Sequence, residues 1–197
     1  SSDLDGKPKF VFVYTVANHF PWDERWAPEL TPGWVDPGNA PDVDEYIRRQ
    51  TISASNYQGF VEQLKKRFPT ESFLIVRFGD HQPVLSQRIL EPRAGSDVVG
   101  RKLASQDPRY FSTYYAIDAV NFRPVDLSSA LERLEAPYLP LVIQEAAGVP
   151  LDPSFAEQKR ILERCKGQFY HCAGGYEARR FNRLLIDAGL IKGMVSR

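Results

Sequence analysis

The sequence has no excess of charge of either sign, no long apolar run and almost no cysteine. Lys and Arg together number 25, as do Asp and Glu, so the formal net charge is zero. A neutral chain is not adapted to a polyanion, which excludes nucleic acid as the main partner. No stretch approaches the ~20 apolar residues of a membrane span, and no signal-peptide pattern begins the chain. Because it also begins without Met, we expect a processed or engineered piece of a protein.

Common catalytic signatures are missing as well. The sequence contains no Gly-x-Ser-x-Gly elbow, no Gly-rich phosphate-binding loop and no dinucleotide-binding fingerprint. What it does have is the composition of an ordinary globular domain, with 197 residues, 43% of them hydrophobic and 25% charged. A chain of this kind suits one domain that buries a sizeable core.

The two cysteines, Cys165 and Cys172, lie close together in the sequence, and Gly167 between them allows the chain to fold back. A short-loop disulfide in an oxidising compartment is one interpretation, and two buried free thiols in a cytoplasmic protein is another. A zinc site that adds His171 would lack a fourth ligand and the usual close spacing. The spacing favours the disulfide, and it favours the zinc site least.

Two apolar runs each end in a polar motif. Residues 10–16 precede Asn-His-Phe-Pro-Trp at 18–22, and residues 73–78 precede Gly-Asp-His-Gln-Pro at 79–83. Runs this apolar are typical of strands that are buried on both faces of a parallel sheet. Arg77, inside the second run, then needs a partner for its charge.

A long amphipathic helix is predicted between the two runs. Apolar residues recur at helical spacing from Tyr46 to Phe68, Asp42 or Asp44 can cap the start, and Pro69 stops the helix. A strand-helix-strand unit of this length suits a parallel crossover. We therefore predict an α/β fold with a mostly parallel sheet and flanking helices. Later segments predict an irregular loop over 84–110, a strand over 113–122, and helices over 128–135, 139–147, 152–165 and 176–188.

Asp80 and His81 stand where open α/β sheets place ligands, just beyond the end of a strand. A carboxylate and an imidazole are a natural ligand pair for a divalent metal. Adjacent strand residues point to opposite faces, so the pair can share one ion only if the chain turns, which Gly79 and Pro83 favour. The simpler alternative is that Asp80 caps the turn through hydrogen bonds, without a metal.

The segment from about residue 18 to Pro41 is rich in Pro, Gly and Trp and has no periodicity, which predicts a surface loop near a site. Trp22, Trp26 and Trp34 are compatible with a substrate groove, but a hydrophobic cluster beneath the loop is the simpler interpretation.

The order of strand, Asn-His-x-Pro-Trp loop, long helix, strand and Gly-Asp-His-Gln-Pro resembles the C-terminal half of a sulfatase-type domain of the alkaline phosphatase superfamily. It is most similar to the branch of lipoteichoic acid synthase and phosphoglycerol or phosphoethanolamine transferases. The resemblance covers about residues 8–122 and includes the segment 113–118. It implies a partial alkaline-phosphatase-like sandwich. Residues 1–197 would then be the C-terminal portion of the catalytic domain, with 125–197 as a possible family-specific extension.

The resemblance implies roles for three residues. Asp80 and His81 would bind a divalent metal ion (Mn, Mg, Zn or Ca), and His19 would contact the phosphate or sulfate group of the substrate. On its own, His19 is more often a structural loop histidine. In this family the nucleophile and the first acidic ligands lie in the N-terminal half, for which there is no room before Phe10. We therefore expect this fragment alone to be inactive.

The implied function is that of a metal-dependent hydrolase or transferase acting on phosphate or sulfate esters, including those linked to a lipid or a glycan. The implied parent is membrane-anchored, with its catalytic domain on the extracytoplasmic or periplasmic face. Reduced cysteines would instead favour a cytoplasmic enzyme of the superfamily. The alternative to an enzyme is a non-catalytic binding or assembly module that retains the fold. We also expect the fragment to self-associate through exposed strand edges.

Overall fold

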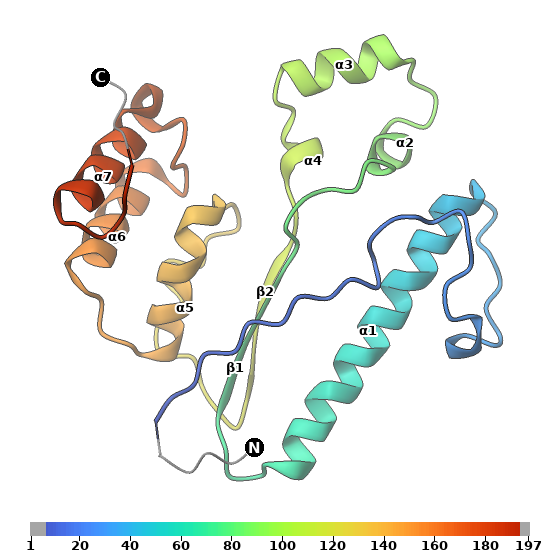
Figure 1. Cartoon of the computed structure of the whole chain (residues 1–197), viewed down its shortest axis with the longest axis horizontal. Coiled ribbons are helices and arrows are strands. Elements are labelled where there is room, and N and C mark those ends of the chain that lie inside the picture. The colour runs from blue at the N-terminus through green and yellow to red at the C-terminus, as the bar shows by residue number, and fades with distance from the viewer. Residues whose placement is uncertain (1–6, 194–197) are drawn as a thin grey trace. The chain divides into compact units, whose positions relative to one another are not determined.

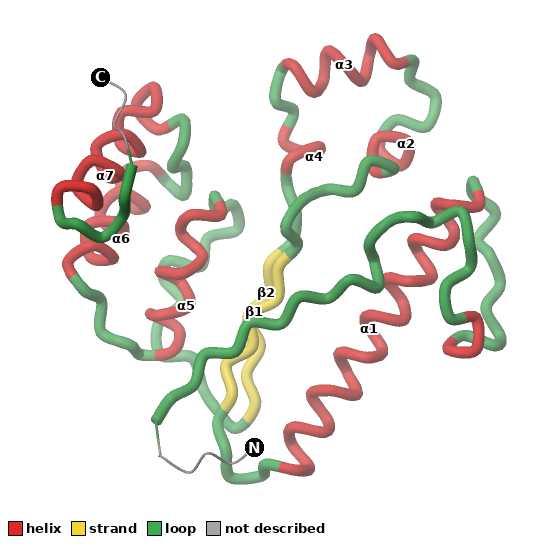
Figure 2. Tube along the Cα trace, in the orientation of Figure 1, coloured by secondary structure: helices red, strands yellow, loops and turns green. Residues whose placement is uncertain are grey.

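The computed structural model describes residues 7–193, which form two compact units (Figure 1). Within the described range, the first unit contains residues 7–67 and 79–114, and the second contains residues 68–78 and 115–193. Helices and loops make up most of both units (Figure 2). None of the helices within residues 7–193 is long and apolar enough to cross a membrane.

The first unit is built on the long helix α1 (Pro41–Arg67), which confirms the helix predicted there. Its charges suit the helix dipole, because acidic residues occupy the first turn and basic residues the last. Pro69 then prevents its continuation. The acidic residues are Asp42 and Asp44, and the basic ones are Lys65, Lys66 and Arg67.

Short helices complete the first unit, and they contradict the irregular loop predicted over 84–110. The chain forms η1 (Pro28–Leu30), α2 (Ser86–Leu90), α3 (Ser96–Ala104) and α4 (Pro108–Phe111). Helices of one or two turns are too short to show a periodic apolar pattern, so the sequence does not reveal them. Among these helices only α4 has a side-chain cap, in which the Asp107 side chain accepts a hydrogen bond from the Arg109 backbone N–H at 3.1 Å.

The second unit contains an antiparallel pair of strands, so the predicted mostly parallel α/β sheet is wrong. Strand β1 (Phe73–Phe78) pairs with β2 (Tyr115–Val120), and Phe73 lies opposite Val120. These two strands form the one sheet of the described chain. Residues 10–16, expected as a buried parallel strand, form no strand and are exposed.

The predicted parallel sheet was wrong because an apolar run shows only that a segment is to be buried against other parts of the protein. The direction of strand pairing depends on where the chain returns, and here it leaves β1 and re-enters the sheet after residues 79–114. β1 is also half-buried, not covered on both faces as predicted, with Phe78 44% exposed. The charge of Arg77 is paired within the sheet, where its Nη2 atom donates to Asp118 Oδ2 at 3.0 Å.

The core of the second unit lies among its helices. These are η2 (Ala136–Tyr138), α5 (Leu139–Ala147), α6 (Pro153–Cys165), η3 (Cys172–Gly175) and α7 (Tyr176–Asp187). The helices predicted near α5, α6 and α7 are confirmed, whereas the one predicted over 128–135 is wrong. Buried apolar side chains from η2, α5, α6, α7 and the loop after α6 pack together; they include Tyr138, Leu141, Ile161, Leu162, Phe169 and Phe181.

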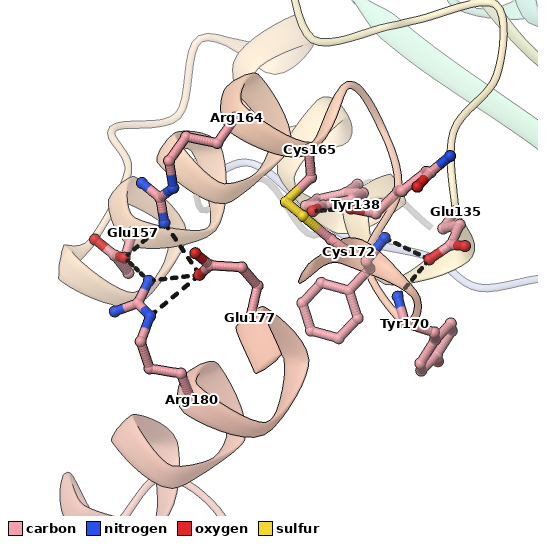
Figure 3. The surroundings of a disulfide bond; sticks show 11 residues. Glu135, Tyr138, Glu157, Arg164, Cys165, Tyr170, Cys172, Glu177 and Arg180 are labelled. Carbon is pink, nitrogen blue, oxygen red and sulfur yellow. Dashed lines mark hydrogen bonds and ion pairs between the residues drawn. A yellow bond between two sulfur atoms is a disulfide. The ribbon is translucent and has the colours of Figure 1, made fainter. Parts of the chain in front are cut away.

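A disulfide joins Cys165 at the end of α6 to Cys172 at the start of η3, with the Cα atoms 5.7 Å apart (Figure 3). The loop between them is also held by hydrogen bonds. The Glu135 carboxylate accepts from the backbone N–H of Tyr170 at 2.7 Å, and the Tyr138 hydroxyl donates to the Gln168 carbonyl at 2.9 Å. Because both sulfurs are bonded, neither is available as a thiolate ligand for zinc.

Gly167 in this loop is expected to be intolerant of a side chain. Its φ is +85°, and a Cβ there would lie 2.4 Å from the Arg133 carbonyl oxygen. Gly189 provides the matched control, because its φ is +70° but no atom lies within 4 Å of such a Cβ. We predict that Gly189→Ala costs about 1 kcal/mol of unfolding free energy through backbone strain alone. Gly167→Ala should cost clearly more, because backbone atoms must also shift.

The comparison is made by chemical denaturation of the oxidised protein, followed by circular dichroism. Equal losses for the two variants would show that the close approach of Gly167 to Arg133 has no energetic consequence.

Candidate functional site

A buried ionic cluster holds the loop that carries His19 against the first turns of α1. At its centre is the carboxylate of Glu45, which is 3% exposed. One of its oxygens accepts from Arg49 Nε at 2.7 Å and from the Trp26 backbone N–H at 3.0 Å. The other accepts from Arg48 Nε at 2.8 Å. We call Glu45, Arg48 and Arg49 the α1 ion cluster.

The two arginines of this cluster extend the contacts to the loop backbone. Arg49 donates to the carbonyl of His19 at 3.0 Å and to that of Glu24 at 3.1 Å. Arg48 donates to the Trp26 carbonyl and, at 2.6 Å, to the Thr31 hydroxyl. The main chain at His19 is therefore fixed, while its imidazole stays exposed.

Neutral and ionic hydrogen bonds add to this anchoring on both sides of His19. The Ser53 hydroxyl of α1 donates to the Asn18 side-chain oxygen at 2.9 Å, and the Trp22 indole donates to the Asn18 carbonyl at 3.1 Å. The buried Asp44 carboxylate accepts from the backbone N–H groups of Gly38 and Asn39, each at 3.0 Å. The predicted surface loop is thus closely tied to the helix.

Burial of Glu45 opposes its ionisation, but its hydrogen bonds from Arg48, Arg49 and the Trp26 N–H outweigh that effect and lower its pKa to about 2. The hydrogen bond with Glu45 in turn raises the pKa of Arg48, whose side chain is fully buried. The cluster is therefore ionised at neutral pH, and each buried charge has a partner.

His19 and His81 present the same ring nitrogen outward. His19 Nδ1 lies 2.9 Å from the Phe20 carbonyl oxygen, and His81 Nδ1 lies 3.0 Å from that of Gln82. A carbonyl oxygen only accepts hydrogen bonds, so Nδ1 carries the proton in each neutral ring. Nε2 then keeps its lone pair, which is the arrangement of a histidine ready to bind a metal.

Asp80 and His81 converge although they are neighbours in the sequence. The chain bends at Asp80 and His81, and the Asp80 Oδ1 atom accepts from the His81 backbone N–H at 3.0 Å. The Asp80 Oδ2 and His81 Nε2 atoms then lie 3.7 Å apart, and both side chains are exposed. The bend is further held where Gly79 N–H donates to the Tyr114 carbonyl at 3.1 Å.

This geometry is close to that of two ligands on one ion. Ligand atoms with bonds of about 2.1 Å to a common metal lie roughly 3.0–3.4 Å apart, a distance that small side-chain rotations would reach from 3.7 Å. No third His, Cys, Asp or Glu side chain joins the pair to form a larger ligand group in the part of the chain that the structure describes. The pair therefore offers two ligands, and the remaining positions would need water or other groups.

The α1 ion cluster was not among the site residues predicted from the sequence. Its spacing, with Arg48 and Arg49 three and four residues after Glu45, is a usable signal, because such residues face one another on a helix. Charges at this spacing usually indicate a solvated helix face, and here they are buried.

No family model matches the chain, and no curated protein or solved structure shows detectable similarity to it. The interpretation of the two motifs therefore depends on their residues and geometry.

The first unit is expected to be sensitive to the loss of any one partner of the α1 ion cluster. We predict that Glu45→Gln costs about 3–5 kcal/mol of unfolding free energy, because it leaves two buried guanidinium groups without their carboxylate. The depressed pKa of Glu45 means that its contribution is present above about pH 4.5 and is lost as the pH falls toward about 2. The wild type should therefore lose stability over that range more steeply than the Glu45→Gln variant.

Denaturant midpoints measured between pH 6 and pH 2.5 test this expectation. Glu62→Gln, at an exposed position of the same helix, is the matched control and should behave like the wild type. Parallel acid curves for the wild type and Glu45→Gln would contradict the assignment.

Proposed function

We propose that this chain supplies part of the divalent-metal site of a sulfatase-like hydrolase, or of a phosphoglycerol or phosphoethanolamine transferase, that acts on phosphate or sulfate esters. The observation that carries the proposal is the convergence of Asp80 Oδ2 and His81 Nε2 to 3.7 Å at a bend of the chain. The order of this motif after the His19 loop and the long helix supports the same function.

Each residue has a defined part in this proposal. The Gln82 carbonyl fixes the His81 ring so that Nε2 faces the ion, and the Asp80 Oδ2 atom provides the charged ligand. The metal, when bound, polarises an oxygen of the ester as a Lewis acid. His19, in its protonated form, donates a hydrogen bond through Nε2 to an ester oxygen or to the leaving alkoxide. Arg49 positions His19 by holding its carbonyl.

The proposed site is incomplete within this chain. The resemblance on which it rests places the nucleophile and the remaining acidic ligands in a preceding segment of the domain. Two ligands alone leave most coordination positions of an ion open, so we propose that this piece by itself binds metal weakly and does not turn over esters.

The disulfide supports an oxidising compartment, because such bonds persist mainly outside the cytoplasm. We propose that the parent protein is membrane-anchored and that this part lies on its extracytoplasmic face.

A non-catalytic binding or assembly module is the second candidate. The observation in its favour is that the ligand pair gains no third His, Cys, Asp or Glu within residues 7–193. The two candidates differ in whether Asp80 and His81 bind an ion at all.

Calorimetric titration of the chain with Mn²⁺, Mg²⁺, Zn²⁺ and Ca²⁺ separates them. We predict saturable binding of at least one ion, weakened about tenfold or more in Asp80→Asn and in His81→Gln, because each change removes one of two ligands. Asp97→Asn is the control, since that carboxylate is 70% exposed on α3 and outside the motif. Equal affinity in the Asp80 and Asp97 variants would overturn the metal site and favour the module.

A further inference from the structure

A hollow of about 340 Å³ lies in the first unit beside both motifs. Its walls come from the His19 loop, the first turn of α1 and the segment that follows the Gly-Asp-His-Gln-Pro motif. The residues that line it are Trp22, Asp42, Val84, Leu85, Gln87 and Arg88.

The position of this hollow is tied to the candidate site by the chain itself. Trp22 is three residues after His19, and Val84 is three residues after His81. Three residues span at most about 11 Å of chain, so Trp22 and Val84 each lie within that reach of a motif histidine. A group that is attached to an ester at the motifs is therefore within reach of the hollow.

The indole of Trp22 is held in a fixed orientation. Its Nε1 atom donates to the Asn18 carbonyl at 3.1 Å, and its ring meets Tyr46 edge-on, with centroids 5.7 Å apart. The side chain remains partly exposed where it lines the hollow. An aromatic ring fixed in this way offers an apolar contact surface at low entropic cost.

The polar groups of the hollow are balanced in charge. Arg88 donates to the Asp42 carboxylate, so one positive and one negative side chain lie together. The Gln87 side chain adds an amide that both donates and accepts. An anion is disfavoured because the negative charge of Asp42 lies beside Arg88. An acyl chain is disfavoured because it would remove water from three polar side chains without replacing their hydrogen bonds.

We propose that this hollow binds an uncharged polyhydroxylated ring, that is, a sugar. Hydroxyl groups can donate to Asp42 and accept from Arg88 and Gln87, while a C–H face of the ring packs on the Trp22 indole. The assignment of this sugar as the alcohol component of the ester rests on the function proposed above. The proposal that the hollow binds a sugar does not depend on that function.

The test uses the full chain in EDTA, with methyl α-D-glucopyranoside and methyl β-D-galactopyranoside as probes and cyclohexanol as the apolar control. Saturation-transfer NMR and titrated tryptophan fluorescence report binding. We expect saturable binding of at least one glycoside and none of cyclohexanol. Trp22→Ala and Arg88→Gln should each weaken the binding at least fivefold. The matched controls Trp34→Ala and Arg93→Gln should leave it unchanged.

Glycoside binding that is equal in all four variants, or absent from the wild type, overturns the proposal. Tighter binding of inorganic phosphate than of either glycoside also overturns it, because it would make the hollow an anion site. If Trp22→Ala fails to fold, Arg88→Gln still decides, because the Arg88 side chain is 56% exposed. Because EDTA removes metal, the sugar test is independent of the calorimetric metal titration. Glycoside binding without metal binding upholds the sugar site and overturns the metal site. Metal binding without glycoside binding upholds the metal site and overturns the sugar site.

Discussion

The carboxylate of Glu45 is the group on which the arrangement of the first unit depends. It neutralises two arginines that have almost no access to water, and those arginines bind the backbone carbonyls of His19, Glu24 and Trp26. Buried ion pairs contribute little net stability when complete but leave a large penalty when one partner is removed. The cluster therefore acts by fixing one arrangement of an aperiodic loop, and this places the imidazole of His19.

Helices with long periodic patterns and clear ends were predictable from the sequence. Pro69 marked the end of α1, and Asp152 marked the start of α6, where its carboxylate accepts from the Ser154 backbone N–H at 2.8 Å. The sheet was not predictable, because the apolar run at 73–78 specifies a strand but neither its partner nor its direction. The parallel crossover assumed that residues 10–16 would pair with it, and the pairing that forms is with Tyr115–Val120.

The candidate site was predictable only where local chemistry decides the geometry. Gly79 and Pro83 indicated a change of chain direction at Asp80 and His81, and the chain bends at these two residues. The loop partners of Arg48 and Arg49 were not predictable, because they are mainly carbonyl groups of a segment without periodicity. Every residue has a backbone carbonyl, so the sequence does not indicate which carbonyl groups an arginine will bind.

The central claim is that Asp80 and His81 bind one divalent ion and that the His19 loop belongs to the same site. The chain has three histidines, so their imidazole proton resonances can be followed individually while Mn²⁺ is added. The account predicts paramagnetic broadening that is strongest for His81 and next affects His19, with the broadening of His81 abolished in Asp80→Asn. Broadening that is equal for all three rings, or that spares His81, would contradict it.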